Sequence, residues 1–227
     1  MIISVHIRKA GGSSFRQALK NYYGKKLLLD YGDEIGSNFE SSKKKRLISK
    51  QKIIKNKQNI IENYNIIHGH FFAQKYEEIL GKQLAYVTFL RDPVERVLSN
   101  YFYLKRNPKR KNPDAQLIHK MGYSLQEYIQ HPDACNVQSQ FLNEKKLNEF
   151  KFVGVVEQYH QSIILYNKIF NTKLEIKSLK NVNPNKNYDY QISKHTHDLI
   201  VQNNQKDIKL YSEALKILNT KCKTYEY

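Results

Sequence analysis

Short apolar runs alternate along the chain with segments in which apolar positions recur every three or four residues. Short apolar runs bounded by polar turns are typical of buried strands, whereas the periodic segments are typical of amphipathic helices. Strands are predicted at residues 2–7, 65–68, 84–90 and 152–156. Helices are predicted at residues 13–23, 73–80, 93–105, 124–130, 137–142 and 158–170, and in two pieces over 192–218.

The order of these elements predicts the fold class. A helix between two strands forms a crossover, and repeated crossovers build a mostly parallel sheet with helices on both faces. The run at 84–90 (LAYVTFL) is apolar almost throughout, as expected for a strand that is covered on both faces. We therefore expect an α/β three-layer sandwich with a mostly parallel central sheet, and residues 1–227 are expected to form a single domain.

Residues 41–64 combine apolar positions at helical spacing with many lysines, which predicts one or two amphipathic helices with a lysine-rich outer face. The apolar positions are Leu47, Ile48, Ile53, Ile54, Ile60 and Ile61. A lysine-rich face is commonly a solvated helix surface, and the alternative is a face that binds a polyanion.

Composition adds a strong positive charge to this picture. The chain has 38 Lys and Arg against 21 Asp and Glu, a formal net charge of +17. Such a charge attracts nucleic acid, anionic lipid or a sulfated or phosphorylated ligand, and it does not choose among them. Because the chain has no Trp and no recognisable helix-turn-helix, RRM or zinc module, nucleic acid is not the expected partner, although a basic nucleic-acid-binding protein stays an alternative.

The cysteines and the lengths of the apolar runs indicate the cellular compartment in which the chain is expected. Cys135 and Cys222 lie far apart without a CxxC or Cys/His pattern, which favours a reducing compartment. No apolar stretch approaches the roughly 18 residues that a membrane span needs. The first apolar run leads directly into a glycine-rich turn, so it is typical of a buried strand rather than of a signal peptide.

The first predicted strand ends in a glycine-rich turn that opens a helix, within HIRKAGGSSF. Backbone N–H groups of residues 11–14 can converge there on an anion, at the positive end of the helix. Lys9 adds a mobile charge, and Ser13 and Ser14 add hydroxyl donors. Since the lysine precedes the glycines, the Walker order is absent and a nucleotide kinase is the less favoured alternative. A turn that only reverses the chain is the structural alternative.

A second candidate anion site follows the strand at 84–90, in TFLRDPVERVLSNYFYLK. Arg91 comes at the carboxyl end of a buried strand, where ligands collect in open α/β sheets. Asp92 is expected to cap the next helix, with Pro93 at its first position. Arg91 could contact a phosphate through two N–H groups, and Ser99, two turns further on, could donate another hydrogen bond. The alternative is a salt-bridged strand-to-helix junction.

Two histidines lie between these segments, in IIHGHFF. His68 and His70 are two residues apart at a strand end and should project to the same side, with Gly69 leaving room between them. Such a pair can act in proton transfer, ligate a metal or be structural. No third ligand has a suggestive spacing, so no metal is expected.

Together the motifs resemble those of PAPS-dependent carbohydrate sulfotransferases. HIRKAGGSSF is similar to the 5′-phosphosulfate loop HxPKTGGTS, with Arg8 in place of the usual proline and Ala10 in place of the usual threonine. RDPxxRxxSxYxxL resembles the 3′-phosphate motif, and HGH resembles the heparan/dermatan uronyl 2-O-sulfotransferase branch. CNVQSQFL and KFVGVVEQYHQSIILY resemble later segments, so the similarity covers roughly residues 3–166.

The resemblance implies an O-sulfotransferase that moves a sulfuryl group from PAPS to an acceptor hydroxyl and releases PAP, without a metal. It implies that His70 is the general base, that His68 supports it, and that Lys9 neutralises developing charge. The 5′-phosphosulfate would be held by Lys9, Ala10, Gly11, Gly12, Ser13 and Ser14, and the 3′-phosphate by Arg91 and Ser99.

The resemblance also bears on partners and location. The acceptor would be a carbohydrate, a glycolipid or another hydroxyl compound, and the basic surface would suit an anionic one. In the family a loop near the C-terminus closes over the nucleotide, which makes Asn183 and Lys186 candidates. The enzymes resembled are typically tethered by an N-terminal membrane helix, whereas this chain starts on a predicted core strand, so a cytoplasmic location is expected.

Overall fold

The computed structural model describes residues 1–33, 40–81, 83–110, 112–143, 145–175 and 190–225. The strands in these ranges are β1 (Ile2–Val5), β2 (Leu27–Asp30), β3 (Ile66–Gly69), β4 (Ala85–Leu90) and β5 (Phe152–Val155). The α-helices are α1 (Gly12–Tyr23), α2 (Glu40–Lys55), α3 (Lys57–Asn63), α4 (Lys75–Leu80), α5 (Pro93–Lys105), α6 (Pro113–His119), α7 (Leu125–Gln130), α8 (Val137–Leu142), α9 (Tyr159–Phe170), α10 (Lys194–Asn203) and α11 (Gln205–Tyr225).

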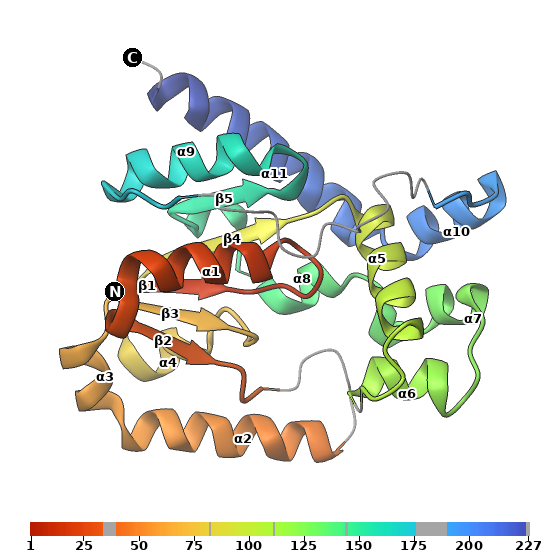
Figure 1. The fold of residues 1–227 in the computed structure, drawn as a ribbon, viewed down its shortest axis with the longest axis horizontal. Coiled ribbons are helices and arrows are strands. Elements are labelled where there is room, and N and C mark those ends of the chain that lie inside the picture. The colour runs from red at the N-terminus through yellow and green to blue at the C-terminus, as the bar shows by residue number, and fades with distance from the viewer. Residues whose placement is uncertain (34–39, 82, 111, 144, 176–189, 226–227) are drawn as a thin grey trace.

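The strands form one parallel sheet in the order β2-β3-β1-β4-β5. β1 lies at its centre, where Ser4 is opposite His68 and Val5 is opposite Gly69 on β3. Helices α1 and α9 lie on one face of the sheet, and α4 and α8 lie on the other (Figure 1). The predicted α/β class with three layers and a parallel sheet is confirmed.

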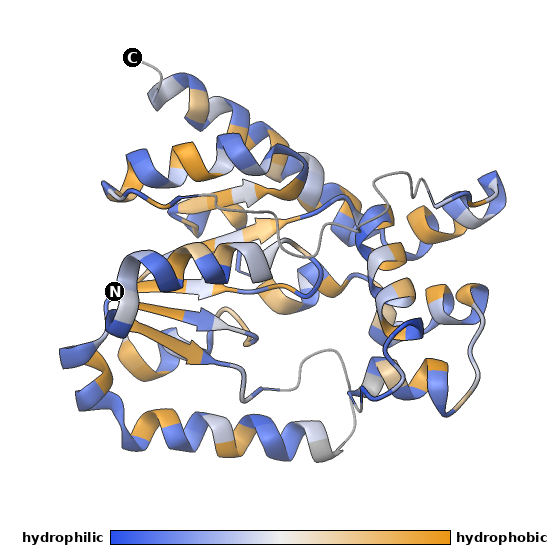
Figure 2. Ribbon diagram, in the orientation of Figure 1, coloured by the Kyte–Doolittle hydropathy of each residue, from blue (hydrophilic) through white to orange (hydrophobic). Residues whose placement is uncertain are grey.

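The strands are apolar because helices cover both faces of the sheet. Ile3, Val87 and Phe152 are completely buried, and they belong to one apolar cluster that includes the inner sides of α1 and α9. Figure 2 shows this pattern as apolar strands inside helices with polar outer sides. None of the helices among the described residues is long and apolar enough to cross a membrane.

A second apolar cluster lies beyond the carboxyl ends of the strands and joins α5, α6, α7 and α10 (Figure 1). The predicted start of α5 is confirmed: Asp92 is its N-cap and accepts a hydrogen bond from the Glu95 amide at 3.0 Å, with Pro93 in the first turn. Helix α6 was not predicted, because its seven residues are too few to show a clear helical period. This second cluster forms a wall beside the end of the sheet where the candidate site residues lie.

The edge strand β2 is a further element that the sequence did not predict. It has only four residues, and its side chains are mostly half exposed, so it lacks the continuous apolar run of a central strand. A buried polar cluster fixes it instead. The Lys75 ammonium donates to Asp30 Oδ2 at 2.7 Å, to Asp33 Oδ1 at 2.6 Å and to Ser49 Oγ at 2.8 Å. These bonds join β2 to α2 and α4.

Helices α2 and α3 confirm the helical prediction for residues 41–64, but their apolar residues do not all face inward. Ile53 and Ile60 are buried, whereas Leu47, Ile48, Ile54 and Ile61 are exposed by 57%, 55%, 50% and 48%. The reason is the edge position of α2, which packs mainly on α4 and so buries a narrow stripe. The outer face is therefore both basic and apolar.

Candidate active site

The glycine-rich turn lies between β1 and α1, at the carboxyl end of the central strand. Its backbone is left-handed at Lys9, with φ 63°, and at Gly11, with φ 71°. A non-glycine residue in this region is uncommon and is frequently associated with function. The turn leads directly into α1, whose first turn contains residues 12–14, and the Ser14 amide donates to the Gly11 carbonyl oxygen at 3.2 Å. Ser13 lines a cavity, whereas Ala10 and Ser14 are buried.

Gly12 is required by a neighbour that the sequence analysis did not single out. A Cβ at this position would lie 1.8 Å from ring atoms of His6. His6 directly follows β1, and its imidazole occupies the space beside the start of α1. The glycine therefore allows a histidine ring to approach the first turn of α1.

Three imidazoles stack at this strand end. The His6 ring lies between His68, at a centroid distance of 4.9 Å, and His70, at 4.3 Å. The His6 ring fills the space between His68 and His70, so Gly69 does not leave an open gap between them. A Cβ at Gly69 would lie 1.6 Å from the Asp30 carbonyl oxygen, so the missing side chain serves the approach of β2.

Hydrogen bonds fix the orientation of each imidazole. His68 Nδ1 pairs with Ser4 Oγ at 2.8 Å, and His6 Nδ1 pairs with the Tyr31 hydroxyl at 2.9 Å. His70 Nδ1 lies 2.6 Å from the His6 carbonyl oxygen. A carbonyl can only accept, so His70 Nδ1 carries the proton and Nε2 of the neutral ring keeps its lone pair.

The histidines are held neutral. The pKa of His68 is lowered to about 3, chiefly by burial and also by repulsion from neighbouring His70 and Arg16. The pKa of His70 is lowered to about 4; burial is the largest cause, the bond to the His6 carbonyl opposes the shift, and Arg8 and Arg16 contribute to it. Burial lowers the pKa of His6 as well. At neutral pH, His70 therefore presents an unprotonated Nε2.

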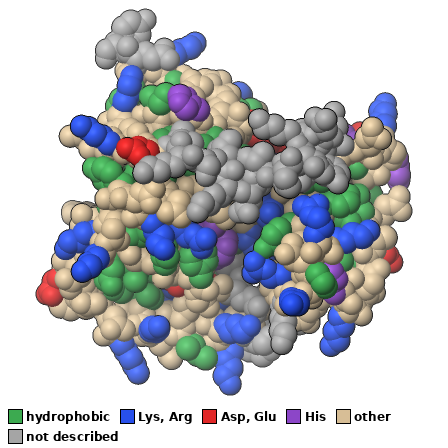
Figure 3. Space-filling view, in the orientation of Figure 1, with side chains coloured by type: hydrophobic (Ala, Val, Ile, Leu, Met, Phe, Trp, Pro, Cys, Tyr) green, Lys and Arg blue, Asp and Glu red, His purple; other side chains and the backbone are tan. Residues whose placement is uncertain are grey.

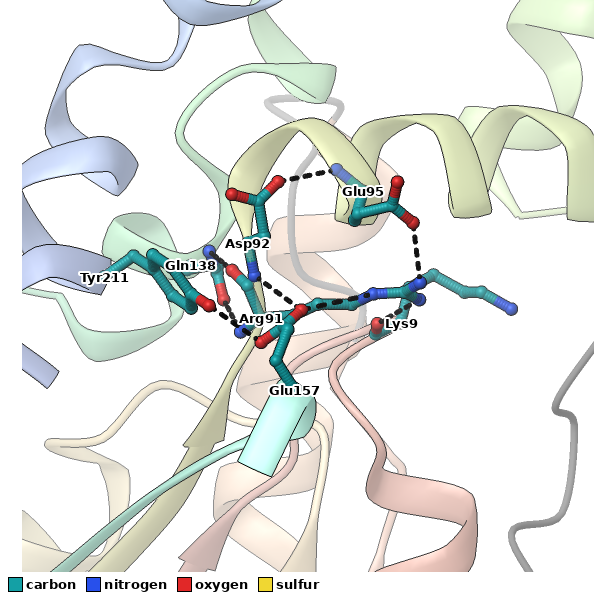
Figure 4. Close-up of polar contacts among 7 residues, drawn as sticks. All are labelled: Lys9, Arg91, Asp92, Glu95, Gln138, Glu157 and Tyr211. Atoms are coloured by element: carbon teal, nitrogen blue, oxygen red, sulfur yellow. Dashed lines mark hydrogen bonds and ion pairs between the residues drawn. The ribbon is translucent and has the colours of Figure 1, made fainter. Parts of the chain in front are cut away.

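Arg91 lies at the end of β4, close to the glycine-rich turn (Figure 4). Its guanidinium donates to the Lys9 carbonyl oxygen at 3.3 Å and to Glu95 Oε2 at 3.2 Å, and its Nε lies 4.0 Å from Glu157 Oε1. The two predicted anion segments are thus in contact. The ion pairs of Arg91 with Glu95 and Glu157 are also those expected for a salt-bridged strand-to-helix junction, the alternative interpretation of this segment.

A side chain from α8 holds the Arg91 backbone. Gln138 Oε1 accepts from the Arg91 amide, and Gln138 Nε2 donates to the Arg91 carbonyl, each at 2.9 Å. The carboxylate of Glu157 accepts from the Asp92 amide at 3.1 Å and from the Tyr211 hydroxyl at 3.0 Å (Figure 4). Helices α8 and α11 therefore determine how the end of β4 is placed.

Lys9 lies among other cations. Its pKa is lowered to about 8 by burial, the largest cause, together with repulsion from Arg91, Arg106 and Arg110. The Lys9 ammonium lies 4.0 Å from the centre of the Tyr103 ring, and Arg110 donates to the Tyr103 hydroxyl at 2.6 Å. A cluster of like charges around a half-buried lysine favours binding of an anion.

A cavity of about 550 Å³ opens beside the histidine stack. Its lining includes His6, Lys9, Ser13 and His70 from the strand ends, with Tyr103 from α5. Further basic and aromatic groups around it are Arg8, Arg16, Tyr31, Lys45, Arg110 and Phe141. Neither Arg91 nor Ser99 belongs to the described lining; Ser99 is half-buried on α5.

Arg8, which departs from the family's loop pattern, is anchored. Its guanidinium forms an ion pair of 2.9 Å with Asp114 on α6. Asp114 is buried and also accepts from Asn100 at 2.8 Å. The arginine thus ties the turn after β1 to the second apolar cluster.

The structure brings Lys9, Ser13 and His70 to one cavity, with Arg91 bonded to the same turn. His68 lies beneath it. Within the described ranges, no group of three or more His, Cys, Asp or Glu is arranged to hold a metal ion. Asn183 and Lys186 lie outside the described residues.

Sequence reasoning missed His6, Tyr31, Tyr103 and Gln138. Of these four, His6 alone had a signal in the sequence, its place at the start of the loop motif.

The fold and this geometry define a class: a parallel α/β protein with a basic, glycine-rich anion site at the carboxyl end of its central strand. The sulfotransferase family model matches residues 1–212, so the chain belongs to the sulfotransferase family. A sulfotransferase structure from Alicyclobacillus acidocaldarius has the same fold, with a TM-score of 0.53 over 92% of both chains at 13% identity. No curated protein sequence matches the chain significantly.

Proposed function

We propose that this sulfotransferase moves a sulfuryl group from PAPS to a hydroxyl of a carbohydrate-type acceptor, with residues 1–227 acting as one domain. The observation that carries the proposal is the placement of His70. Its Nδ1 is bonded to the His6 carbonyl, and the ring lines the same cavity as Lys9 and Ser13. A proton acceptor and an anion-binding turn therefore share one space.

The nucleotide would be held at two places. Lys9, the amides of residues 11–14, and the hydroxyls of Ser13 and Ser14 would hold the 5′-phosphosulfate, while Arg91 and Ser99 would hold the 3′-phosphate. Members of the family generally use PAPS, and the cations around Lys9 support an anionic ligand. Glu95 would have to leave Arg91, which its 46% exposed side chain allows.

PAPS supplies a sulfuryl group already activated on a phosphate. The acceptor oxygen forms a bond to sulfur as the bond from sulfur to the phosphate oxygen breaks, and its electron pair stays with PAP. The acceptor proton passes to His70 Nε2. Lys9 neutralises the charge that grows on the leaving phosphate.

The low pKa of His70 is compatible with the role of general base. Burial lowers the pKa of His70 to about 4, and repulsion from Arg8 and Arg16 contributes to this shift. A bound phosphosulfate places negative charge beside these cations, which raises the pKa of His70 toward the working pH. The base would thus become stronger when the donor is in place. The HGH tripeptide extends the proposal to a uronyl-type 2-O acceptor.

Transfer from labelled PAPS to a panel of saccharides and glycolipids tests the proposal. General-base catalysis contributes about 10²- to 10⁴-fold, so His70→Ala should lower kcat by that factor. The affinity for PAP, measured by calorimetry, should stay within about threefold, because His70 does not hold the nucleotide. The matched control is His160→Ala, which removes an exposed histidine on α9. Full turnover of His70→Ala on an identified acceptor would contradict the assignment of the base.

A further inference from the structure

The outer face of α2 combines lysines with exposed aliphatic side chains. We define this basic apolar face by its members, Lys44, Leu47, Ile48, Lys52, Ile54 and Lys55. Residues 41–61 contain eight Lys or Arg, no Asp or Glu and no aromatic residue. In Figure 3 this edge of the molecule, below the sheet, carries basic side chains with apolar patches between them.

The spacing places both kinds of side chain on one surface. Ile48 has Lys44 four residues before it and Lys52 four residues after it, so the three are neighbours on the helix. Leu47 and Ile54 are seven residues apart and lie on one side. Apolar and basic groups are therefore interleaved, rather than divided between two faces.

These side chains are not used by the rest of the fold. Lys50, on the inner side of α2, pairs with Glu78 on α4. Lys44, Lys52 and Lys55 form no ion pair with any residue in the described ranges, and they are exposed. Leu47, Ile48 and Ile54 are at least half exposed. A solvated face would not need large aliphatic groups at these positions.

We propose that the basic apolar face docks onto an anionic lipid surface. Lysines are attracted to acidic headgroups, and leucine and isoleucine enter the boundary of the acyl chains. A saccharide or nucleic-acid partner would use the lysines but would offer nothing apolar to the aliphatic groups. Single-stranded nucleic acid is typically bound through stacking on aromatic side chains, which residues 41–61 lack.

The face also adjoins the cavity. Lys45 belongs to α2 and lines the cavity that contains His70. Docking through α2 would bring the cavity mouth close to the lipid surface. This consequence, which rests on the proposed function, favours an acceptor hydroxyl carried on a lipid headgroup.

Binding of the full chain to vesicles tests the docking without any transfer reaction. Wild type should bind vesicles of phosphatidylcholine mixed with phosphatidylserine, and should bind phosphatidylcholine alone much more weakly. Each lysine near an acidic surface contributes about fivefold, so the triple variant Lys44→Gln, Lys52→Gln, Lys55→Gln should bind about 100-fold more weakly. The matched control removes the same charge from α11 at Lys209, Lys216 and Lys223, on the opposite side of the molecule (Figure 1).

A second variant distinguishes binding to a lipid surface from binding to other polyanions. Leu47→Ser, Ile48→Ser, Ile54→Ser keeps every charge and changes only exposed side chains, so the fold should stay intact by circular dichroism. Its partition onto the mixed vesicles should fall at least about tenfold. Equal binding by this variant and wild type would overturn the lipid assignment. So would failure of wild type to bind the mixed vesicles, whatever its transferase activity.

Discussion

Lys9 holds a positive charge where other positive charges surround it. Its backbone is left-handed, its ammonium lies over the Tyr103 ring, and burial with three nearby arginines lowers its pKa to about 8. The charge of this residue therefore changes in a pH range where the arginines stay protonated. A bound anion would reverse the repulsion and raise the pKa of Lys9.

The difference between the pKa of Lys9 in the free protein and its pKa beside a bound anion predicts how nucleotide affinity depends on pH. PAP should bind most tightly when Lys9 is protonated, so affinity should be nearly constant below about pH 8. Above that pH the free protein loses the proton, and affinity should fall by up to about tenfold per pH unit, with proton uptake on binding. Calorimetry in buffers of different ionisation enthalpy measures both effects.

Lys9→Arg is the control for this titration. Arginine keeps the charge and stays protonated throughout the range, so the decrease in affinity above pH 8 should disappear. An unchanged pH dependence in this variant would assign the titration to another group.

Single residues differ in how far the sequence could reveal them. Lys9, Gly12, His68, His70 and Arg91 stand in motifs whose order carries chemical meaning. His6 stands at the start of the loop motif, but its contacts, which use the backbone carbonyl and ring stacking, leave no sequence pattern of their own. Gln138 meets the Arg91 backbone across 47 positions, a contact that only the fold creates.

At the scale of elements, the core strands and the helices that carry motifs could be predicted, because each is a continuous apolar run or a strongly periodic segment. Strand β2 could not, since its partner is the backbone of β3 and its stability comes from the polar cluster around Lys75. The sequence contained one sign of it, a glycine between two histidines. Gly69 has no side chain because Asp30 on β2 lies against it.

Gly69→Ala therefore tests the contact between the two strands. Its Cβ would lie 1.6 Å from the Asp30 carbonyl oxygen, and backbone of a paired strand cannot move aside cheaply. We expect a loss of about 3 kcal/mol in the free energy of unfolding, measured by urea denaturation. Gly81→Ala has no atom within 4 Å of its Cβ and should lose about 1 kcal/mol, through its positive φ alone. Equal effects of the two substitutions would contradict the close approach of β2.

At the scale of the whole molecule, positive charge is used in different ways at different places. Around the turn after β1 it is partly buried and surrounds a cavity, whereas on α2 it is exposed among aliphatic groups. The net charge of +17 could not distinguish these uses. The placement of each cation by the fold separates a proposed nucleotide site from a proposed lipid-binding face.

The central claim is that the two strand ends bind a nucleotide with a 3′-phosphate. Calorimetry with PAP, AMP and ATP tests it most directly, because AMP lacks that phosphate and ATP extends the 5′ chain instead. Charge-assisted contacts from Arg91 predict that PAP binds about 10- to 100-fold more tightly than AMP, and that Arg91→Ala removes most of this difference. Preferential binding of ATP, or no binding of any of the three nucleotides, would contradict the account.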